Sequence, residues 1–357
     1  MTKPLEAHAA HFRKQAEWCD RLGSPFNAAL LWGLADELGD GGPLDALLMA
    51  GDSPLMPEAA DAGPLRVAGA LHGLVLTGRD PALVAVYPGT NPDWDMASVL
   101  PVVRAAFETH SGWVADFLTR PPQTNETRRS IALLPGFARI AGHGPLHLLE
   151  VGASAGLNLN WDAFGYDGGS WSRAGHRAGP TMTTHWSGPP PQLPPSFDVV
   201  SRRGCDRDPV DISDPGARLR LKAYIWPDQP DRMSRLDAAL AMADRFPVTV
   251  DRADAAPWLE DQLAGALSEG TTVIYHSIAW QYFDADTHAR AKAAIETTGA
   301  RADDRHRLAW LRFEPARVFD PVDRSAKTRV DLITWPGGTR QLIADADPHG
   351  ARVAAIF

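Results

Sequence analysis

The feature that most constrains the fold of this chain is a short apolar run that ends in a glycine turn. Residues 147–151 form the run, Gly152-Ala-Ser-Ala-Gly156 follows directly, and residues 157–164 have the apolar spacing of a helix. This order predicts a β-strand, a tight turn and a helix, because glycine lets the main chain turn sharply and approach a ligand closely. The N–H groups at the start of the helix then face the same place. We therefore expect the first strand of a parallel sheet, with a binding crevice beyond its carboxyl end.

The chain beyond this unit alternates apolar runs with helical segments. Strands are expected at 197–200, 247–250, 272–275, 308–313 and 330–335, and helices at 258–267 and 287–298. Alternation of this kind predicts a doubly wound α/β sheet. The last run and residues 340–344, joined by Pro336-Gly-Gly338, are expected to form a terminal antiparallel hairpin.

The chain before the glycine turn is expected to be helical. Helical spacing of apolar residues occupies 5–21, 26–38, 65–76, 99–118 and 127–140. Ser24-Pro25 and Asp80-Pro81 mark helix starts, with a capping side chain before a proline at the first helical position. We predict an α-helical domain over 1–142, followed by an α/β domain over 143–357. The proline-rich residues 179–195 are expected to be an insertion, either a functional loop or a solvated linker.

Composition argues against several classes of partner. The formal net charge is −9, whereas binding to nucleic acid needs a basic surface. The two cysteines, Cys19 and Cys205, lie far apart, so neither a disulfide framework nor a cysteine-based zinc site is expected. Residues 1–21 lack the apolar core of a signal peptide, and no run reaches the ~18 apolar residues of a membrane span. We expect a cytoplasmic protein with a small-molecule substrate and with no metal, nucleic-acid or membrane partner.

The sequence Glu-Val-Gly-Ala-Ser-Ala-Gly-Leu-Asn, which begins at Glu150, resembles the first motif of S-adenosylmethionine-dependent methyltransferases. The resemblance implies a Rossmann-like methyltransferase fold for the α/β domain and S-adenosylmethionine as the cofactor. It also implies that the motif cradles the methionine and ribose parts of that cofactor. The chain departs from the motif at Ser154, where the family has its middle glycine. The residues that the motif places at the cofactor are Glu150, Gly152, Ala153, Ser154, Gly156 and Asn158.

Two further acids fit the same template. Asp206 follows the second predicted strand, where a carboxylate can accept hydrogen bonds from both ribose hydroxyls. Its distance from Gly152 exceeds the usual spacing of ~20 residues, so the proline-rich insertion must loop out between them. Asp254 and Ala255 follow the third strand, and the resemblance implies that Asp254 accepts from the adenine amino group. The alternative for each aspartate is a surface or helix-capping role.

Candidate catalytic groups lie at the ends of the next two strands. Transfer of an activated methyl group is an in-line displacement, so the enzyme mainly aligns the nucleophile, and a base is needed only where the acceptor must lose a proton. His276 is a candidate base and cofactor contact at the end of the fourth strand, since imidazole titrates near neutral pH. Glu314, at the end of the fifth, is a candidate base or amine-binding group. A hydrogen-bonded structural histidine and a surface acid are the alternatives.

Six residues are candidates for substrate contact. They are Ser277, Trp280, Tyr282, Asn125, Glu126 and Arg128. The first three follow the strand end at His276, and the rings of Trp280 and Tyr282 can pack on the cofactor or face a cation. The other three open the helix at 127–140 and are expected to reach over the crevice. An ordinary helix cap is the alternative for this second group.

The whole chain also resembles a bacterial family, domain of unknown function 2332. The matching pieces include Leu71-His-Gly-Leu-Val-Leu76, residues 149–159, Arg203-Gly-Cys-Asp-Arg-Asp-Pro-Val-Asp211 and His276-Ser277. The pieces are spread over nearly the full length of the chain. This resemblance supports the fold and implies no particular activity.

The sequence therefore favours a small-molecule methyltransferase with the helical domain as a lid or substrate wall. A serine hydrolase is a second hypothesis, because the Gly-x-Ser-x-Gly order around Ser154 also fits a nucleophile elbow, with Asp254 and then His276 or His349 as partners. A non-catalytic nucleoside-binding or scaffold protein is a third. A nicotinamide-dependent oxidoreductase is disfavoured, because the Gly-x-Gly-x-x-Gly order is absent.

Overall fold

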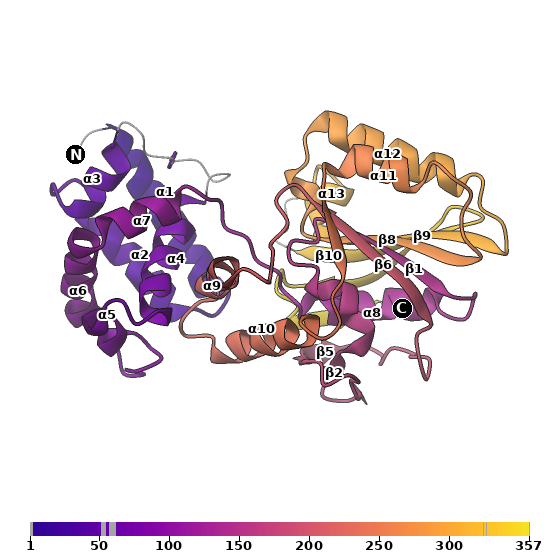
Figure 1. The fold of residues 1–357 in the computed structure, drawn as a ribbon, viewed down its shortest axis with the longest axis horizontal. Coiled ribbons are helices and arrows are strands. Elements are labelled where there is room, and N and C mark those ends of the chain that lie inside the picture. The colour runs from indigo at the N-terminus through magenta and orange to yellow at the C-terminus, as the bar shows by residue number, and fades with distance from the viewer. Residues whose placement is uncertain (1–2, 51–54, 57–61, 324, 326, 357) are drawn as a thin grey trace. The chain divides into compact units, whose positions relative to one another are not determined.

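The computed structural model describes residues 3–50, 55–56, 62–323, 325 and 327–356 (Figure 1). Contacts within the chain divide it into two compact units. Unit 1 comprises Met1–Thr124 and Ser213–Ser234, and unit 2 comprises Asn125–Ile212 and Arg235–Phe357. This division differs from the boundary predicted at residue 142, because the helix that precedes the first strand packs on the sheet of unit 2.

Unit 1 is helical, as predicted. Its helices are α1 (Lys3–Arg21), α2 (Pro25–Glu37), α3 (Pro43–Met49), α4 (Gly63–Leu76), α5 (Pro81–Val86), α6 (Met96–Thr109), α7 (Ser111–Leu118) and α9 (Pro215–Ala223), and α10 (Pro230–Ala243) begins in it. Two predicted helix starts are confirmed, since the side chains of Ser24 and Asp80 accept hydrogen bonds from the main chain of α2 and α5. The single helix predicted at 99–118 is two helices, which meet at His110.

A buried histidine and a half-buried aspartate fasten the second segment of unit 1 to its first. His72 of α4 is buried, and its Nδ1 lies 3.2 Å from the carbonyl oxygen of Ala223 in α9. Burial lowers the pKa of His72 to about 4, against the opposing effect of this hydrogen bond. Asp228 accepts hydrogen bonds from the Ser24 hydroxyl (2.6 Å) and from Phe26 N (2.9 Å).

Within the described residues, unit 2 is built around a nine-stranded, mostly parallel sheet with the order β5-β12-β11-β10-β9-β8-β1-β6-β7. The strands are β1 (Leu146–Val151), β5 (His185–Ser187), β6 (Val199–Asp206), β7 (Thr249–Arg252), β8 (Gly270–Ser277), β9 (His306–Pro315), β10 (Thr328–Trp335), β11 (Thr339–Ala346) and β12 (Arg352–Ala355). All neighbouring strands from β7 to β9 are parallel. Counted along the chain, these five strands have the order 3-2-1-4-5 of a doubly wound, Rossmann-like sheet. The order reverses between β1 and β8, which is where such sheets bind ligands.

The other side of the sheet is antiparallel. β10 pairs antiparallel with both β9 and β11, so the predicted terminal hairpin is confirmed. β12 pairs with β11, and β5 lies parallel to β12 at the edge. β5 and β4 (Thr181–Thr183) belong to the proline-rich residues 179–195, which are therefore partly β-structure and not a plain loop. β4 completes a small second sheet with β2 (Gly165–Asp167) and β3 (Ser172–Arg173).

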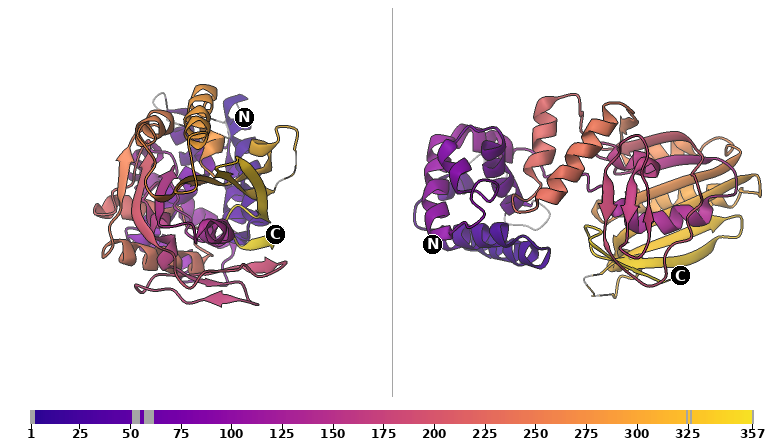
Figure 2. Two further views of the ribbon diagram at one scale, coloured as in Figure 1. Left: turned by 90° about the vertical axis from the view of Figure 1, so that its right-hand side faces the viewer. Right: turned by 90° about the horizontal axis from the view of Figure 1, so that it is seen from below.

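Helices cover both faces of the large sheet (Figures 1 and 2). α8 (Arg129–Ile140) packs on one face against β9, β10 and β11. α11 (Ala255–Gln262) and α12 (Ala285–Gly299) pack against each other on the opposite face. The layered arrangement is that of an α/β protein whose parallel strands are buried on both sides.

Strand side chains alternate between the two faces. Tyr275 and Leu311 join the apolar cluster under α8, whereas Ile274 and Trp310 join the cluster under α11 and α12. α8 approaches the sheet very closely, since a Cβ added at Gly136 would lie 2.3 Å from Leu311 Cδ1.

The segment after the glycine turn is not the α-helix expected at 157–164. It is a 3₁₀ helix, η2 (Leu157–Ala163), in which Asn160 leaves the helical region of φ/ψ space. Asn160 Nδ2 donates to the carbonyl oxygen of Phe246 (3.1 Å). Asparagine side chains that bond to main chain elsewhere compete with helical hydrogen bonds, which accounts for the departure.

Candidate functional site

The glycine turn after β1 is held tightly by its neighbours. Gly152, Ser154 and Gly156 have φ values of +70°, +53° and +70°. A Cβ at Gly152 would lie 2.4 Å from Ala279 Cβ, and one at Gly156 would lie 2.7 Å from Val250 Cγ2. Glycine is needed at both positions for the left-handed conformation and for this close packing. The turn therefore touches the segment after β8 on one side and β7 on the other.

The main-chain N–H groups of the turn point into the protein. Gly152 N and Ala153 N both donate to the carbonyl oxygen of Cys205 in β6, at 2.9 and 3.0 Å. Gly156 N donates to Ala153 O at 2.8 Å, and Ser154 N donates to the carboxylate of Asp206 in β6. These donors are thus not available to cradle a phosphate, in contrast to a glycine-rich anion site.

Asp206, at the end of β6, is the carboxylate that holds the turn. Its Oδ2 accepts from Ser154 N at 2.8 Å, and its Oδ1 accepts from Asp208 N at 3.0 Å. The side chain is half-buried. Each carboxylate oxygen can accept a second hydrogen bond. Asp206 therefore lies where the sequence predicted it, with its plane set by two main-chain donors.

Asp254 lies at the same edge of the sheet. Ala253 N donates to the carbonyl oxygen of Asp206 at 2.9 Å, which brings the ends of β6 and β7 together. Asp254 precedes α11 without capping it through its side chain, and it pairs with Arg207 at 2.8 Å. Its side chain is 56% exposed, whereas the adjacent Ala255 is buried. An exposed pair of this kind contributes little stability and can open for a ligand.

Glu150 lies inside the protein, near the end of β1 and two residues before Gly152. It is 2% exposed, and its Oε2 is 3.2 Å from the hydroxyl of Tyr275, which is also 3.3 Å from the carbonyl oxygen of Asn158. Burial raises the pKa of Glu150 to about 8, the Tyr275 hydrogen bond opposes the shift, and the charge of Asp206 adds to it. Glu150 is therefore mostly protonated at neutral pH.

Asn125 and Glu126 contact the segment that follows the turn. Asn125 Oδ1 accepts from Leu157 N at 2.9 Å, and Asn158 Nδ2 donates to the carbonyl oxygen of Glu126 at 3.4 Å. Both residues belong to unit 2 and not to the helical domain in which the sequence predicted them. Arg128 points elsewhere, since its Nε donates to the carbonyl oxygen of His349 at 3.0 Å.

His276 and Glu314 form a fully buried pair. His276 Nδ1 lies 2.7 Å from Glu314 Oε1, and Trp310 Nε1 donates to His276 Nε2 at 3.2 Å. Because Nε2 accepts from the indole, the proton of the neutral ring is on Nδ1. Burial lowers the pKa of His276, and the Glu314 hydrogen bond and charge oppose this shift. Neither ring nitrogen is turned to solvent, so this pair is placed to support neighbouring main chain.

The main chain that this pair supports is the segment 277–280. Glu314 Oε1 also accepts from Ala279 N at 2.8 Å and from Trp280 N at 2.9 Å. Ile278 in this segment has a φ of +53°. The carboxyl group therefore holds a strained turn, whose Ala279 packs against Gly152.

The three substrate candidates at and after the end of β8, which are Ser277, Trp280 and Tyr282, have different surroundings. The carbonyl oxygen of Ser277 accepts from Arg129 Nη1 at 3.0 Å. Trp280 is 5% exposed, stacks on His276 with ring centroids 4.9 Å apart, and begins the 3₁₀ turn η3 (Trp280–Tyr282). Tyr282 is 73% exposed. Trp280 thus packs against the buried His276–Glu314 pair, whereas Tyr282 lies at the surface.

Three contacts of the site were not foreseen from the sequence. Tyr275 bonds to Glu150, Trp310 sets the tautomer of His276, and Glu314 holds the segment after β8. Tyr275 and Trp310 read as ordinary apolar strand residues. The local signals are their positions, two residues before the end of β8 for Tyr275 and four residues before Glu314 for Trp310.

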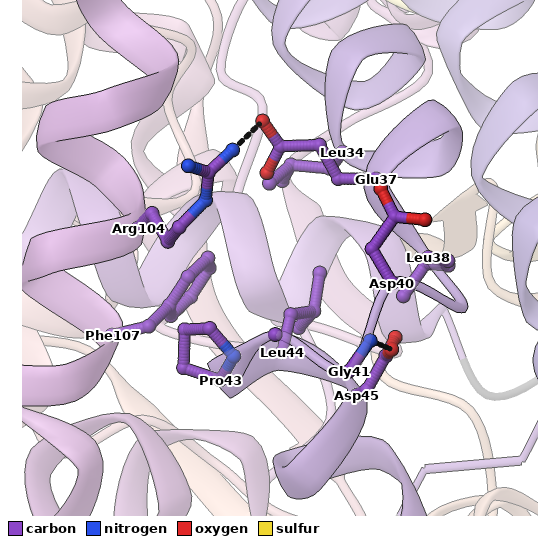
Figure 3. A pocket seen from close by; sticks show the side chains of 11 residues that line it. Leu34, Glu37, Leu38, Asp40, Gly41, Pro43, Leu44, Asp45, Arg104 and Phe107 are labelled. Carbon is purple, nitrogen blue, oxygen red and sulfur yellow. Dashed lines mark hydrogen bonds and ion pairs between the residues drawn. The ribbon is translucent and has the colours of Figure 1, made fainter.

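Unit 1 has a pocket of its own, with a volume of about 310 Å³ (Figure 3). Its sides come from α2, α3 and α6. Arg104 pairs with Glu37 at 2.7 Å, and the buried Asp45 accepts from Gly39 N and Gly41 N. The guanidinium and the buried carboxylate thus already have protein partners.

No three His, Cys, Asp or Glu side chains of the described part of the chain gather closely enough to hold a metal ion. No helix there is long and apolar enough to cross a membrane.

Comparison with known proteins identifies a family. The model of a family described as "uncharacterized protein conserved in bacteria" (DUF2332) matches residues 9–354. The chain belongs to this family. A search of curated proteins found no match, and a search of solved structures found none either.

Proposed function

We propose that this protein is an enzyme that binds S-adenosylmethionine at the carboxyl ends of β1, β6 and β7 and transfers its methyl group to a small molecule. The observation that carries the proposal is the position of Asp206. Its carboxylate lies against the glycine turn, next to the point where the strand order of the sheet reverses, and its main-chain carbonyl oxygen accepts a hydrogen bond from Ala253 N, one residue before Asp254. Doubly wound sheets bind their ligands at this place.

The acceptor groups at this edge of the sheet support this cofactor over a dinucleotide. The N–H groups of Gly152, Ala153, Ser154 and Gly156 donate within the protein, and the side chains at this edge include the carboxylates of Asp206 and Asp254. A ligand with hydroxyl and amino donors and a positive charge suits such a set, whereas a pyrophosphate does not. In this proposal Asp206 holds the ribose hydroxyls, and Asp254 accepts from the adenine amino group once Arg207 has moved aside.

The cofactor supplies a methyl group that is already activated, so the protein needs only to align the acceptor. Gly152 and Ala279 set the distance between the ends of β1 and β8. Glu314 and His276 keep the segment 277–280 in place, and the protonated Glu150 adds little charge beneath the turn. We further propose that unit 1 serves as a lid or substrate wall, and that the acceptor is a small molecule, because a net charge of −9 disfavours binding to nucleic acid.

The proposal is tested by isothermal titration with S-adenosylhomocysteine. We expect the unmodified protein to bind it, and Asp254→Asn and Asp206→Asn each to weaken binding about 10-fold, the value of a lost hydrogen bond to a charged group. Asp208→Asn is the matched control, because Asp208 lies two residues after Asp206 and pairs with Arg252 at the surface. Absence of binding to the unmodified protein would overturn the proposal, as would equal affinities in all three variants.

One feature of the glycine turn favours the second hypothesis, a serine hydrolase. Ser154 has the left-handed conformation of a nucleophile elbow. In the described residues, however, its hydroxyl has no hydrogen-bond partner, and both nitrogens of His276 are engaged elsewhere. Labelling with a fluorophosphonate decides between a hydrolase and a methyltransferase. A covalent adduct on Ser154 would overturn the methyltransferase proposal in favour of a hydrolase. Cofactor binding without methyl transfer to any metabolite mixture would instead favour a nucleoside-binding protein.

A further inference from the structure

A wide groove lies on the α12 face of unit 2, at the ends of β8 and β9. Its volume is about 770 Å³, which is within the range of small-molecule sites. The 3₁₀ turn η3, helix α12, strands β9 and β11 and the short helix α13 (Ala316–Phe319) all contribute to it. The lining side chains that matter here are Trp280, Phe283, His288, Lys292, Phe319 and Arg340, together with Trp310 and Arg312 beneath them.

The floor and walls of the groove are aromatic. Trp280 and Trp310 are almost completely buried, with ring centroids 5.1 Å apart. The ring centroids of Phe283 and Trp280 are 5.3 Å apart, and Phe319 lies on Arg312, with its ring centroid 4.9 Å from the guanidinium carbon. Phe283 and Phe319 are half-buried, so that each presents part of its ring to the groove. Such walls favour a flat apolar ligand.

The charged groups of the groove are all cations. Lys292, Arg312 and Arg340 line it, and within the described residues no carboxylate does. Arg312 is held flat between Trp310 and Phe319, at 4.4 and 4.9 Å from the ring centres. A planar guanidinium stacked in this way extends the aromatic surface and adds positive charge.

One buried carboxylate serves two of these cations. Asp331 is 2% exposed; it accepts from Arg312 Nε at 2.7 Å and also bonds to Arg340 Nε. Arg340 is 53% exposed and reaches this shared partner from the rim. Lys292, also exposed, pairs with Glu296 at the long distance of 3.8 Å. Two cations at the rim can therefore take an anionic partner from solvent.

We propose that this groove binds a flat aromatic carboxylate. The ring would lie between Phe283 and Phe319, and the carboxylate would face Arg340 and Lys292. Arginine forks match the geometry of a carboxylate in a bidentate way, which favours this class over a neutral ring. The inference does not need the proposed function, because none of the groove side chains belongs to the glycine turn, Asp206 or Asp254.

Isothermal titration with 2-naphthoate tests the proposal directly. We expect binding, with 2-naphthamide weaker by about 10-fold because it lacks the charge that the cations would meet. Adenosine monophosphate is the third probe, since it combines a flat ring with a phosphate. Equal affinity for naphthoate and naphthamide would overturn the role of the cations, and tighter binding of the nucleotide would overturn the carboxylate class.

Variants separate the groove from the rest of the surface. Arg340→Gln should weaken naphthoate binding about 5- to 10-fold and leave naphthamide binding unchanged. Ala289→Trp, on the exposed side of α12, should fill the groove and weaken both ligands without touching Asp331. Arg305→Gln is the matched control, because Arg305 is an exposed arginine of unit 2 that pairs with Glu269 away from the groove. Naphthoate binding that survives both groove variants would show that the site lies elsewhere.

Discussion

Each unit holds a histidine and a carboxylate away from solvent, partly or fully, and the two units use these side chains differently. In unit 1, His72 and Asp228 each join one helix to the segment 213–234, and their partners are main-chain atoms and one hydroxyl. In unit 2, His276 and Glu314 bond to each other and to the main chain after β8. In unit 1, His72 and Asp228 therefore serve to hold helices together.

The difference follows from the two architectures. In a helical unit the polar main chain is satisfied within each helix, so a buried side chain has few free main-chain groups to meet. In a parallel sheet the strands end together, and the turns beyond them expose unpaired N–H groups at one edge. Glu150 meets Tyr275, and Glu314 meets His276, across 125 and 38 residues of sequence. The two cavities also differ: the arginine that lines the unit 1 pocket, Arg104, pairs with a carboxylate of the same lining, Glu37, whereas the described residues that line the unit 2 groove include cations and no carboxylate.

The largest expected effect comes from Glu314→Ala. This change removes the acceptor of three buried donors, Ala279 N, Trp280 N and His276 Nδ1, so we expect unit 2 to lose about 3–5 kcal/mol of unfolding free energy. Hydrogen exchange followed peptide by peptide measures this, because it reports the two units separately. Protection should fall first in peptides that cover 270–280 and 306–315.

Asp228→Ala is the counterpart in unit 1. Asp228 is half-buried and accepts two hydrogen bonds, so we expect a loss of about 1–2 kcal/mol, confined to unit 1. Glu314→Gln retains one acceptor oxygen and should fall between the two. If Glu314→Ala costs no more than Asp228→Ala, the buried pair does not support the segment after β8 and the contrast between the units fails.

The sequence anticipated the fold better than the roles within the site. Apolar periodicity located the strands from β6 to β11, and proline after a capping residue located the starts of α2 and α5. Local patterns could not show that β5 pairs with β12, because the two come together across more than 160 residues. Nor could they show the break at His110, where helical spacing continues through both α6 and α7.

The site illustrates the same limit. The pattern around Glu150 placed Gly152, Asp206 and Asp254 at one edge of a sheet, and the structure brings these segments together. The pattern did not reveal that His276 is engaged on both nitrogens, because one of its partners is Trp310, a residue of the next strand. Tautomer and burial depend on neighbours across the sheet, which sequence spacing does not encode.

The pH dependence of stability should have opposite signs in the two units. The pKa of Glu150 is about 8 in the folded protein and near 4.5 when unfolded, so between these values only the folded state holds the proton, and unit 2 loses stability as the pH rises. The pKa of His72 is about 4 against 6.5, so unit 1 loses stability as the pH falls through that range. Each slope approaches about 1.4 kcal/mol per pH unit, or about 2–3 kcal/mol between pH 6 and pH 8 for Glu150.

Matched variants isolate each slope. Glu150→Gln keeps a partner for Tyr275 but does not ionise, so the decline of unit 2 above pH 6 should flatten. His72→Gln should flatten the decline of unit 1 below pH 6 and leave unit 2 unchanged. Denaturant unfolding at pH 5 to 9, with hydrogen exchange to assign the transitions, measures both. Slopes of the same sign in both units would contradict the assignment of either group.

The smallest expected effects come from replacing a helical glycine by alanine in each unit, which compares how closely the helices of the two units pack. Gly136 in α8 lies so close to the sheet that a Cβ would meet Leu311 at 2.3 Å, whereas a Cβ at Gly112 in α7 would meet nothing within 4 Å. Gly136→Ala should therefore destabilise unit 2 by about 1–2 kcal/mol, because α8 must move away from β9. Gly112→Ala should stabilise unit 1 by about 0.5–1 kcal/mol, since alanine favours an exposed helix over glycine. Denaturant midpoints of the two variants measure the difference, and a destabilising Gly112→Ala would mean that glycine in unit 1 also serves close packing.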